Sequence, residues 1–213
     1  MMNRVFRRLG VACLSLLIAE ILLVILSWLL SATRMEGVRS LLSSEGIRWF
    51  FGSFTDMMAS PLLVWLMLLL SALGCLQKSG VIPRFPLSTL HSPLSTSPSY
   101  RSRIALRVAS FFLVAYLVIL ALLTLMPHAI LLSATGELFP SAFSHSLIPL
   151  IAFGIILFSV AYGMMSGRLK RLSDILEAMS FGIAKGAPLF ILLILLIQFC
   201  ESLRFVFAPL LMD

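Results

Sequence analysis

One acidic side chain, Glu20, lies in the middle of a long apolar run near the start of the chain. A carboxylate at the centre of a membrane is costly, so it usually faces a bundle interior or a water-filled cavity. There it could carry a proton or pair with a cation. Alternatively, desolvation keeps the carboxyl neutral and it hydrogen-bonds a neighbouring helix. Gln198 lies deep in the last apolar run and also needs a hydrogen-bond partner. Glu20 and Gln198 are therefore our candidates for transport or for helix packing.

Glu201 and Arg204 form a second charged group near the end of the same apolar run. They are three residues apart, which makes them neighbours on a helix surface. An ion pair is expected, with the long side chains reaching toward the membrane surface. We interpret this pair as structural.

Patterns typical of enzymes do not occur in the sequence. We find no Ser-His-Asp arrangement, metal-ligand cluster, phosphate-binding loop or dinucleotide fingerprint. Cys13, Cys75 and Cys200 fall within or beside apolar runs, which favours buried small side chains over a disulfide or metal site. We therefore expect no enzyme, no catalytic residues, no cofactor and no metal.

The composition indicates the environment in which these residues act. Of 213 residues, 60% are hydrophobic and 12% are charged, and a soluble domain could not bury that much apolar surface. The chain is predicted to be an all-α polytopic membrane protein surrounded by a lipid bilayer. The net charge of +7 comes from basic residues between the apolar runs. Orientation explains them better than nucleic acid, so no nucleic-acid partner is expected.

Five apolar runs are long enough to cross a hydrocarbon core of roughly 30 Å as helices. The first resembles a signal peptide, but it is long, contains Glu20 and lacks a clear cleavage site, so we expect a retained helix. The predicted spans are 9–32, 57–76, 104–126, 143–165 and 188–207.

The loop charges predict the orientation. Twelve of the 16 Lys and Arg residues would lie on one side of a five-span arrangement and four on the other. Basic loops stay in the cytoplasm. This split predicts a cytoplasmic N-terminus and an external C-terminus in a multi-pass protein.

Three segments follow from this arrangement. Residues 1–81 contain the first two spans and an outer amphipathic segment, Leu41 to Phe54, whose aromatic side chains suit a membrane interface. Residues 82–103 form a cytoplasmic linker, since four prolines and many serines there disfavour a helix. Residues 104–213 contain three spans.

Small residues at four-residue intervals predict close helix packing. Gly182 and Gly186 follow Ala178 at this spacing, and Gly163 and Gly167 repeat it near the end of the fourth span. Pro188 comes two residues after Gly186 and favours a kink or a broken helix at 182–188. The alternative is a short surface helix that Pro188 turns into an ordinary span.

Several stretches together resemble the AbgT family of bacterial p-aminobenzoyl-glutamate transporters, some of which export drugs. The similarity covers about three-quarters of the chain, in the family's order. It is carried by VRSLLSSEGIRWF and LGCLQKSG at 38–80, RSRIALR at 101–107, GELFPSAFSHSLIPLIAFGIILFSVAYGMMSGRLK at 136–170 and LSDILEAMSFGIAKGAPLFILLILLIQF at 172–199.

The resemblance implies a homodimer in the bacterial inner membrane. Family members have further spans and two re-entrant hairpins that hold substrate and cation. The first hairpin would fall between Gly80 and Tyr100, where this chain has its Pro/Ser segment, and the chain stops shortly after Phe207, before the second. An Asn-Trp pair typical of the family is replaced by Arg204-Phe205. What remains resembles the scaffold and dimerisation part.

Two functional hypotheses follow. The first is a reduced AbgT-type transporter for an anionic solute, working as an oligomer or with a second membrane subunit. The second is a non-transporting scaffold or accessory subunit that anchors or organises a partner complex.

Overall fold

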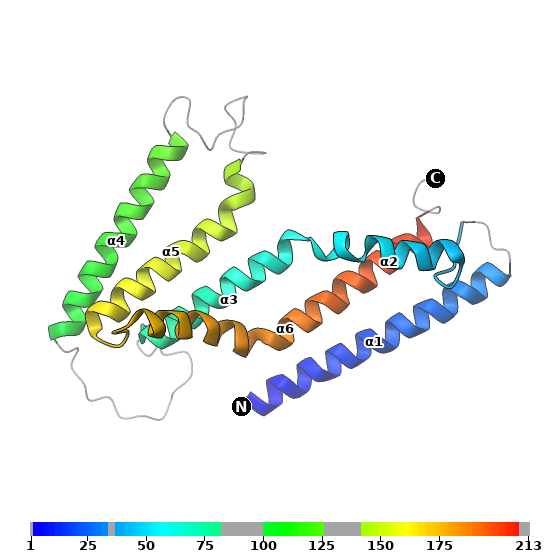
Figure 1. The fold of residues 1–213 in the computed structure, drawn as a ribbon, viewed down its shortest axis with the longest axis horizontal. Coiled ribbons are helices and arrows are strands. Elements are labelled where there is room, and N and C mark those ends of the chain that lie inside the picture. Colours follow the sequence, from blue (N-terminus) through cyan, green and yellow to red (C-terminus); the bar gives the residue numbers. More distant parts are fainter. Residues whose placement is uncertain (1, 34–36, 82–99, 126–141, 209–213) are drawn as a thin grey trace. The chain divides into compact units, whose positions relative to one another are not determined.

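Every regular element of the described chain is a helix (Figure 1). The structure, a computed structural model, describes residues 2–33, 37–81, 100–125 and 142–208. The helices are α1 (Met2–Ala32), α2 (Ser44–Met58), α3 (Pro61–Ser79), α4 (Tyr100–Leu125), α5 (Ala142–Ser166) and α6 (Leu172–Phe207). The all-α prediction is therefore confirmed.

Among the residues that the structure describes, five helical segments are long and apolar enough to cross a membrane, which confirms the predicted class and number of spans. The second of these comprises α2 and α3 together. The chain is thus a multi-pass protein of the lipid bilayer. The segments are Phe6–Ala32, Ser44–Ser79, Tyr100–Thr124, Ser146–Ser166 and Leu172–Phe207.

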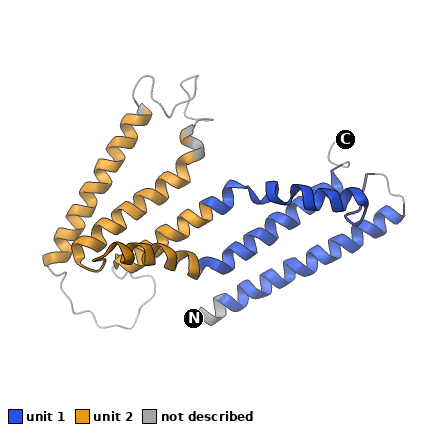
Figure 2. Cartoon of the chain, viewed as in Figure 1, with its two compact units in different colours: residues 1–64, 186–213 blue, residues 65–185 orange. Residues whose placement is uncertain are grey.

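The chain divides into two compact units (Figure 2). Unit 1 comprises Met1–Val64 and Gly186–Asp213, and unit 2 comprises Trp65–Lys185. Both α3 and α6 contribute residues to each unit.

In unit 1, α2 packs on α6, and the segment between α1 and α2 is hydrogen-bonded to both α6 and α1. The Trp49 ring of α2 stacks on Phe205 of α6, with ring centroids 4.3 Å apart. The Arg39 N–H donates to the Val206 carbonyl at 3.0 Å, and the Leu41 N–H donates to Ser27 Oγ of α1 at 3.3 Å. Such bonds are needed because irregular backbone at a membrane must find its partners within the protein.

In unit 2, α4 and α5 run side by side (Figure 1). Small side chains allow this, since Ala105 and Ala109 pack with Tyr162. The Tyr116 hydroxyl donates to the Leu150 carbonyl at 2.9 Å. This bond gives the phenol hydroxyl a hydrogen-bond partner, which surrounding hydrocarbon could not supply.

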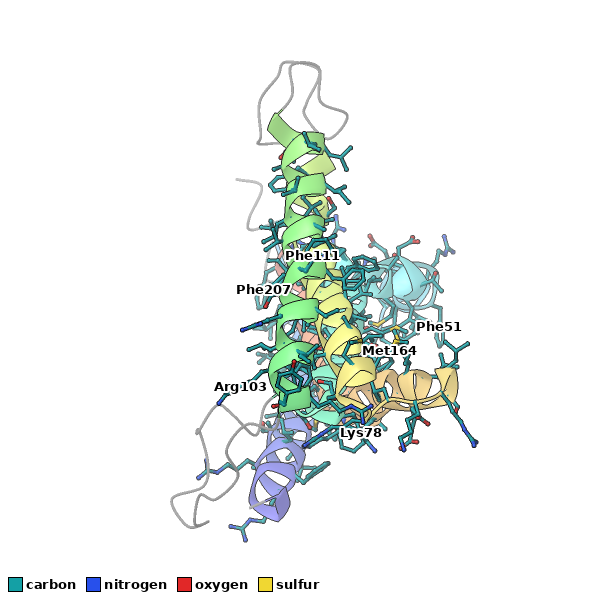
Figure 3. All side chains as sticks on the ribbon, turned by 90° about the vertical axis from the view of Figure 1, so that its left-hand side faces the viewer. Phe51, Lys78, Arg103, Phe111, Met164 and Phe207 are labelled. Carbon is teal, nitrogen blue, oxygen red and sulfur yellow. The ribbon has the colours of Figure 1, made fainter. Side chains whose placement is uncertain are left out.

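Large apolar side chains on α4 remain exposed, which suits contact with lipid. Phe111 is 70% exposed, and Figure 3 shows its side chain projecting from α4, with Arg103 nearer the start of the same helix. An outer surface of this kind is expected where the solvent is hydrocarbon.

Two stretches differ from their expected boundaries. The helix α4 begins at Tyr100, so residues 100–103, assigned to the linker, are helical, while 82–99 lie outside the described residues. The helix α6 is continuous through 182–188 and is not broken there. Pro188 removes one backbone donor, but the residues on both sides keep their helical bonds, so the helix continues.

The predicted amphipathic segment forms α2. Its N-cap is Ser43, whose hydroxyl oxygen accepts from the Gly46 N–H at 3.0 Å. Because the cap satisfies an otherwise unpaired donor, the helix begins at Ser44 rather than earlier.

Candidate functional site

The two polar candidates from the sequence meet in unit 1 through a third residue. The Ser202 hydroxyl of α6 donates to Glu20 Oε1 of α1 at 2.7 Å. Ser202 Oγ in turn accepts from Gln198 Nε2 at 3.2 Å. The side chains of Glu20, Ser202 and Gln198 therefore form one polar chain that links α1 to α6, which we name the Glu20 network.

This network is buried on the α6 side. Ser202 is 0% exposed and Gln198 is 8% exposed, whereas Glu20 is half-buried. Two of its acceptors, Glu20 Oε2 and Gln198 Oε1, are buried and lack a hydrogen-bond partner among the described residues. An unpaired buried polar atom destabilises a protein by about 1–3 kcal/mol. The network can therefore accept further hydrogen bonds at these two oxygens and would be stabilised by them.

A cavity of about 250 Å³ adjoins the network. Glu20 and Ser202 line it together with apolar side chains of α1, the 41–42 segment and α2, which are Val24, Leu41, Leu42, Ile47, Phe50 and Phe51. The cavity thus brings the aromatic face of α2 next to the carboxyl. A carboxyl group in such a place can exchange a proton or pair with a cation.

The local sequence explains only in part why Glu20, Gln198 and Ser202 lie together. Gln198 and Ser202 are four residues apart, so they lie on the same face of α6. That spacing could have identified Ser202, which the sequence analysis missed. The pairing of α6 with α1 depends on tertiary packing, in which Leu23, Phe205 and Val206 share one apolar cluster.

Glu201 and Arg204 lie on the exposed side of the same helix. The Arg204 Nη1 atom is 3.0 Å from Glu201 Oε1, with side-chain exposures of 74% and 34%. An exposed pair of this kind contributes about 0–1 kcal/mol. The structural role of this pair stays a prediction.

The four predicted packing glycines have different surroundings. Gly182 of α6 lies against Gly74 of α3, and a Cβ added to Gly182 would come within 2.8 Å of the Gly74 Cα. A Cβ on Gly163 would meet the Leu169 side chain at 2.5 Å. Gly186 is buried.

Gly167 lies beyond the end of α5, with φ +78. The Arg168 N–H behind it donates back to the Gly163 carbonyl at 3.0 Å. Gly167 therefore terminates the helix in a left-handed conformation that other residues rarely adopt. The sequence pattern had assigned it to a packing face.

Comparison with known protein families identifies the family of the chain. The model of the AbgT transporter family matches residues 88–206, more than half of the 213 residues. The chain belongs to the AbgT transporter family. A search of curated proteins and a search of solved structures returned no significant match.

The match confirms the resemblance seen in the sequence and covers its stretches from 101 onward, whereas the stretch at 38–80 lies outside it. Within the Glu20 network, Gln198 and Ser202 belong to the matched AbgT region and Glu20 does not. As the AbgT family is one of transporters, the protein has a membrane-transport type of function. The described residues contain no group of three His, Cys, Asp or Glu side chains that could hold a metal ion.

Proposed function

We propose that the protein is an AbgT-type transporter of the bacterial inner membrane that moves an anionic solute such as p-aminobenzoyl-glutamate. The observation that carries this proposal is the family match over residues 88–206. In this proposal the chain works as a homodimer or together with a second membrane subunit.

The Glu20 network supports a part for α1 in this transport. Its carboxyl lies beside a cavity, and its two unpaired acceptors can take up positive charge. An anionic solute crosses hydrocarbon more easily when a proton or cation compensates its charge. We infer that Glu20 binds the proton or cation that compensates the charge of the solute during the transport cycle.

Flux measurements in vesicles test the proposal. The full-length protein would be reconstituted, alone and with membrane proteins encoded beside it, and uptake of labelled p-aminobenzoyl-glutamate would be followed. We expect Glu20→Gln to lower the initial rate about tenfold, as the loss of one charged interaction would. The matched control is Glu177→Gln, which removes a carboxylate from the exposed Lys78–Glu177 pair and should leave the rate within about twofold.

The two outcomes separate the claims. Absence of flux for the unaltered protein in every reconstitution would refute transport of this solute. Equal rates for the unaltered protein and Glu20→Gln would refute the role of Glu20 and leave transport standing.

The scaffold or accessory-subunit function is a second candidate, favoured by one feature of the sequence. Between Gly80 and Tyr100 the chain has a Pro/Ser segment where the resemblance places a transport hairpin. Affinity purification from native membranes tests this candidate. Recovery of the chain with only copies of itself would remove its support, while chemical cross-linking of those copies would test the homodimer.

The membrane orientation is also a proposal. The distribution of basic residues favours a cytoplasmic N-terminus, a cytoplasmic segment at 82–103 and an external C-terminus. A cysteine introduced at Ser92 should react with a membrane-impermeant thiol reagent only after the membrane is opened. Equal labelling in sealed and opened spheroplasts would contradict this orientation.

A further inference from the structure

A second cavity of unit 1 has a different character from the one beside Glu20. It has a volume of about 490 Å³, and we name it the arginine cavity. It is lined by Arg39, Glu45, Arg48, Trp49, Glu201, Arg204, Phe205 and Ala208. Five of these eight residues are charged, although the cavity lies at the ends of highly apolar helices.

The charges of both signs are already arranged in pairs. Arg39 Nη1 is 3.4 Å from Glu45 Oε1, and Arg204 Nη1 is 3.0 Å from Glu201 Oε1. Within the described residues Arg48 makes no ion pair, so three guanidinium groups face two carboxylates. The cavity therefore offers donors for an anion and acceptors for a cation side by side.

The aromatic rings give the cavity an apolar wall. Trp49 and Phe205 stack with ring centroids 4.3 Å apart and an angle of 20° between their planes. The Arg39 guanidinium lies over the Phe205 ring, 5.9 Å from its centroid. Aromatic rings also attract ammonium groups, so this wall adds a contact for a cation.

The sequence around the cavity indicates the membrane–water interface. Arg204 lies in the last turn of the apolar helix α6, and Arg48 and Trp49 lie near the start of the amphipathic helix α2, where the second candidate span begins. Trp and Arg at such positions are typical of the headgroup level of a bilayer. Phospholipid headgroups are the most concentrated ligands at that level.

We propose that the arginine cavity binds the headgroup of a zwitterionic phospholipid that carries a primary ammonium group. The phosphate takes hydrogen bonds from the guanidinium groups, with Arg48 as the main donor, because arginine matches phosphate oxygens with paired donors. The ammonium group lies against the carboxylates of Glu45 and Glu201 and the Trp49 ring. The acyl chains remain in the bilayer beside the apolar helices.

The mixed charge favours this ligand over a purely anionic lipid. A single phosphate bound by Arg48 would lie close to the carboxylates of Glu45 and Glu201, whose negative charge opposes its own. A phosphate–ammonium pair satisfies both sets. Removing the carboxylates should therefore change which lipid is preferred, a result that a nonspecific basic surface would not show.

Native mass spectrometry of the purified full-length protein in detergent tests the proposal. Phosphatidylethanolamine and phosphatidylglycerol with identical acyl chains would be titrated in turn. We expect Arg48→Ala to weaken binding of phosphatidylethanolamine about tenfold, the effect of losing a charge-assisted hydrogen bond. The matched control is Arg103→Ala, which removes the same charge from an exposed position at the start of α4 and should change binding less than about twofold.

A second variant tests the selectivity. We expect the double change Glu45→Gln and Glu201→Gln to reverse the preference, so that phosphatidylglycerol binds more tightly than phosphatidylethanolamine. Equal losses for Arg48→Ala and Arg103→Ala would overturn the proposal, as would an unchanged preference in the double variant. The thermal unfolding midpoint of each variant identifies any loss caused by misfolding, and Arg48→Lys, with charge but without paired donors, then replaces Arg48→Ala.

The source of the phosphate is tested by competition. Glycerophosphoethanolamine and inorganic phosphate, which lack acyl chains, should not displace bound lipid at millimolar concentration. Displacement by either one as effectively as by a competing phospholipid would assign the cavity to a soluble phosphate compound and overturn the lipid proposal.

Discussion

Replacing Gly182 by alanine should separate α3 from α6 inside unit 2. The added methyl group would lie within 2.8 Å of the Gly74 Cα and N atoms and closer still to the Leu70 carbonyl oxygen. These are backbone atoms and cannot rotate away as the end of a flexible side chain could. The two helices must therefore move apart at this point.

The expected magnitude follows from two opposing terms. Overpacking of a close contact destabilises a protein by about 1–3 kcal/mol. Alanine in place of glycine within a helix recovers up to about 1 kcal/mol. The two terms together give a loss of about 0–3 kcal/mol in the free energy of unfolding. Because the contact is with backbone atoms, we expect Gly182→Ala to lie in the upper half of this range and a larger side chain to lower the free energy of unfolding further.

Gly10 provides a matched control because a Cβ at that position would meet no atom within 4 Å. Gly10→Ala keeps the favourable helix term without the contact, so it should be neutral or stabilising by up to about 1 kcal/mol. Unfolding in mixed micelles by titration with sodium dodecyl sulfate would measure both variants. Equal stabilities of Gly182→Ala and Gly10→Ala would refute the close approach of α3 and α6.

Three further substitutions test other parts of the structure in the same assay. Ser202→Ala should destabilise the protein by about 0.6–1.7 kcal/mol because it leaves Glu20 and Gln198 without their shared partner, whereas an unchanged stability would contradict the network. Gly167→Ala should destabilise it by about 1–2 kcal/mol because the φ angle of +78 disfavours a side chain, and a stability gain would indicate a different helix end. Lys78→Ala removes an exposed ion pair with Glu177, at 2.9 Å, and should change the stability by less than about 1 kcal/mol.

The Glu20 network also bears on how α1 is held. Most large side chains of α1 are exposed, as expected of a helix with broad lipid contact. Its described polar contacts with the rest of unit 1 include those of Ser27 and Glu20. Hydrogen bonds between membrane helices contribute only modestly in general, about 0.6 kcal/mol on average. The packing of Leu23 with Phe205 and Val206 must therefore supply much of the attachment.

Composition and apolar length were sufficient to predict the class of the protein. Five runs of apolar residues are expected to form helices in a bilayer, because a helix satisfies all its backbone hydrogen bonds within one segment. The positions of α1, α3 and α5 followed from the same argument, as did the helical spacing that brings Glu201 to Arg204. These are local properties, and each depends on residues close together in the chain.

The candidate site depended on contacts between distant segments. Nothing in the spacing of residues 20 and 202 indicates that Ser202 donates to Glu20, because this requires one face of α1 to meet one face of α6. The repeating pattern of small residues likewise did not indicate that Gly182 would lie against Gly74. Nor did it indicate that Gly167 would end a helix. Periodicity shows which face of a helix is small or polar, but only side-chain packing in three dimensions selects the helix that covers it.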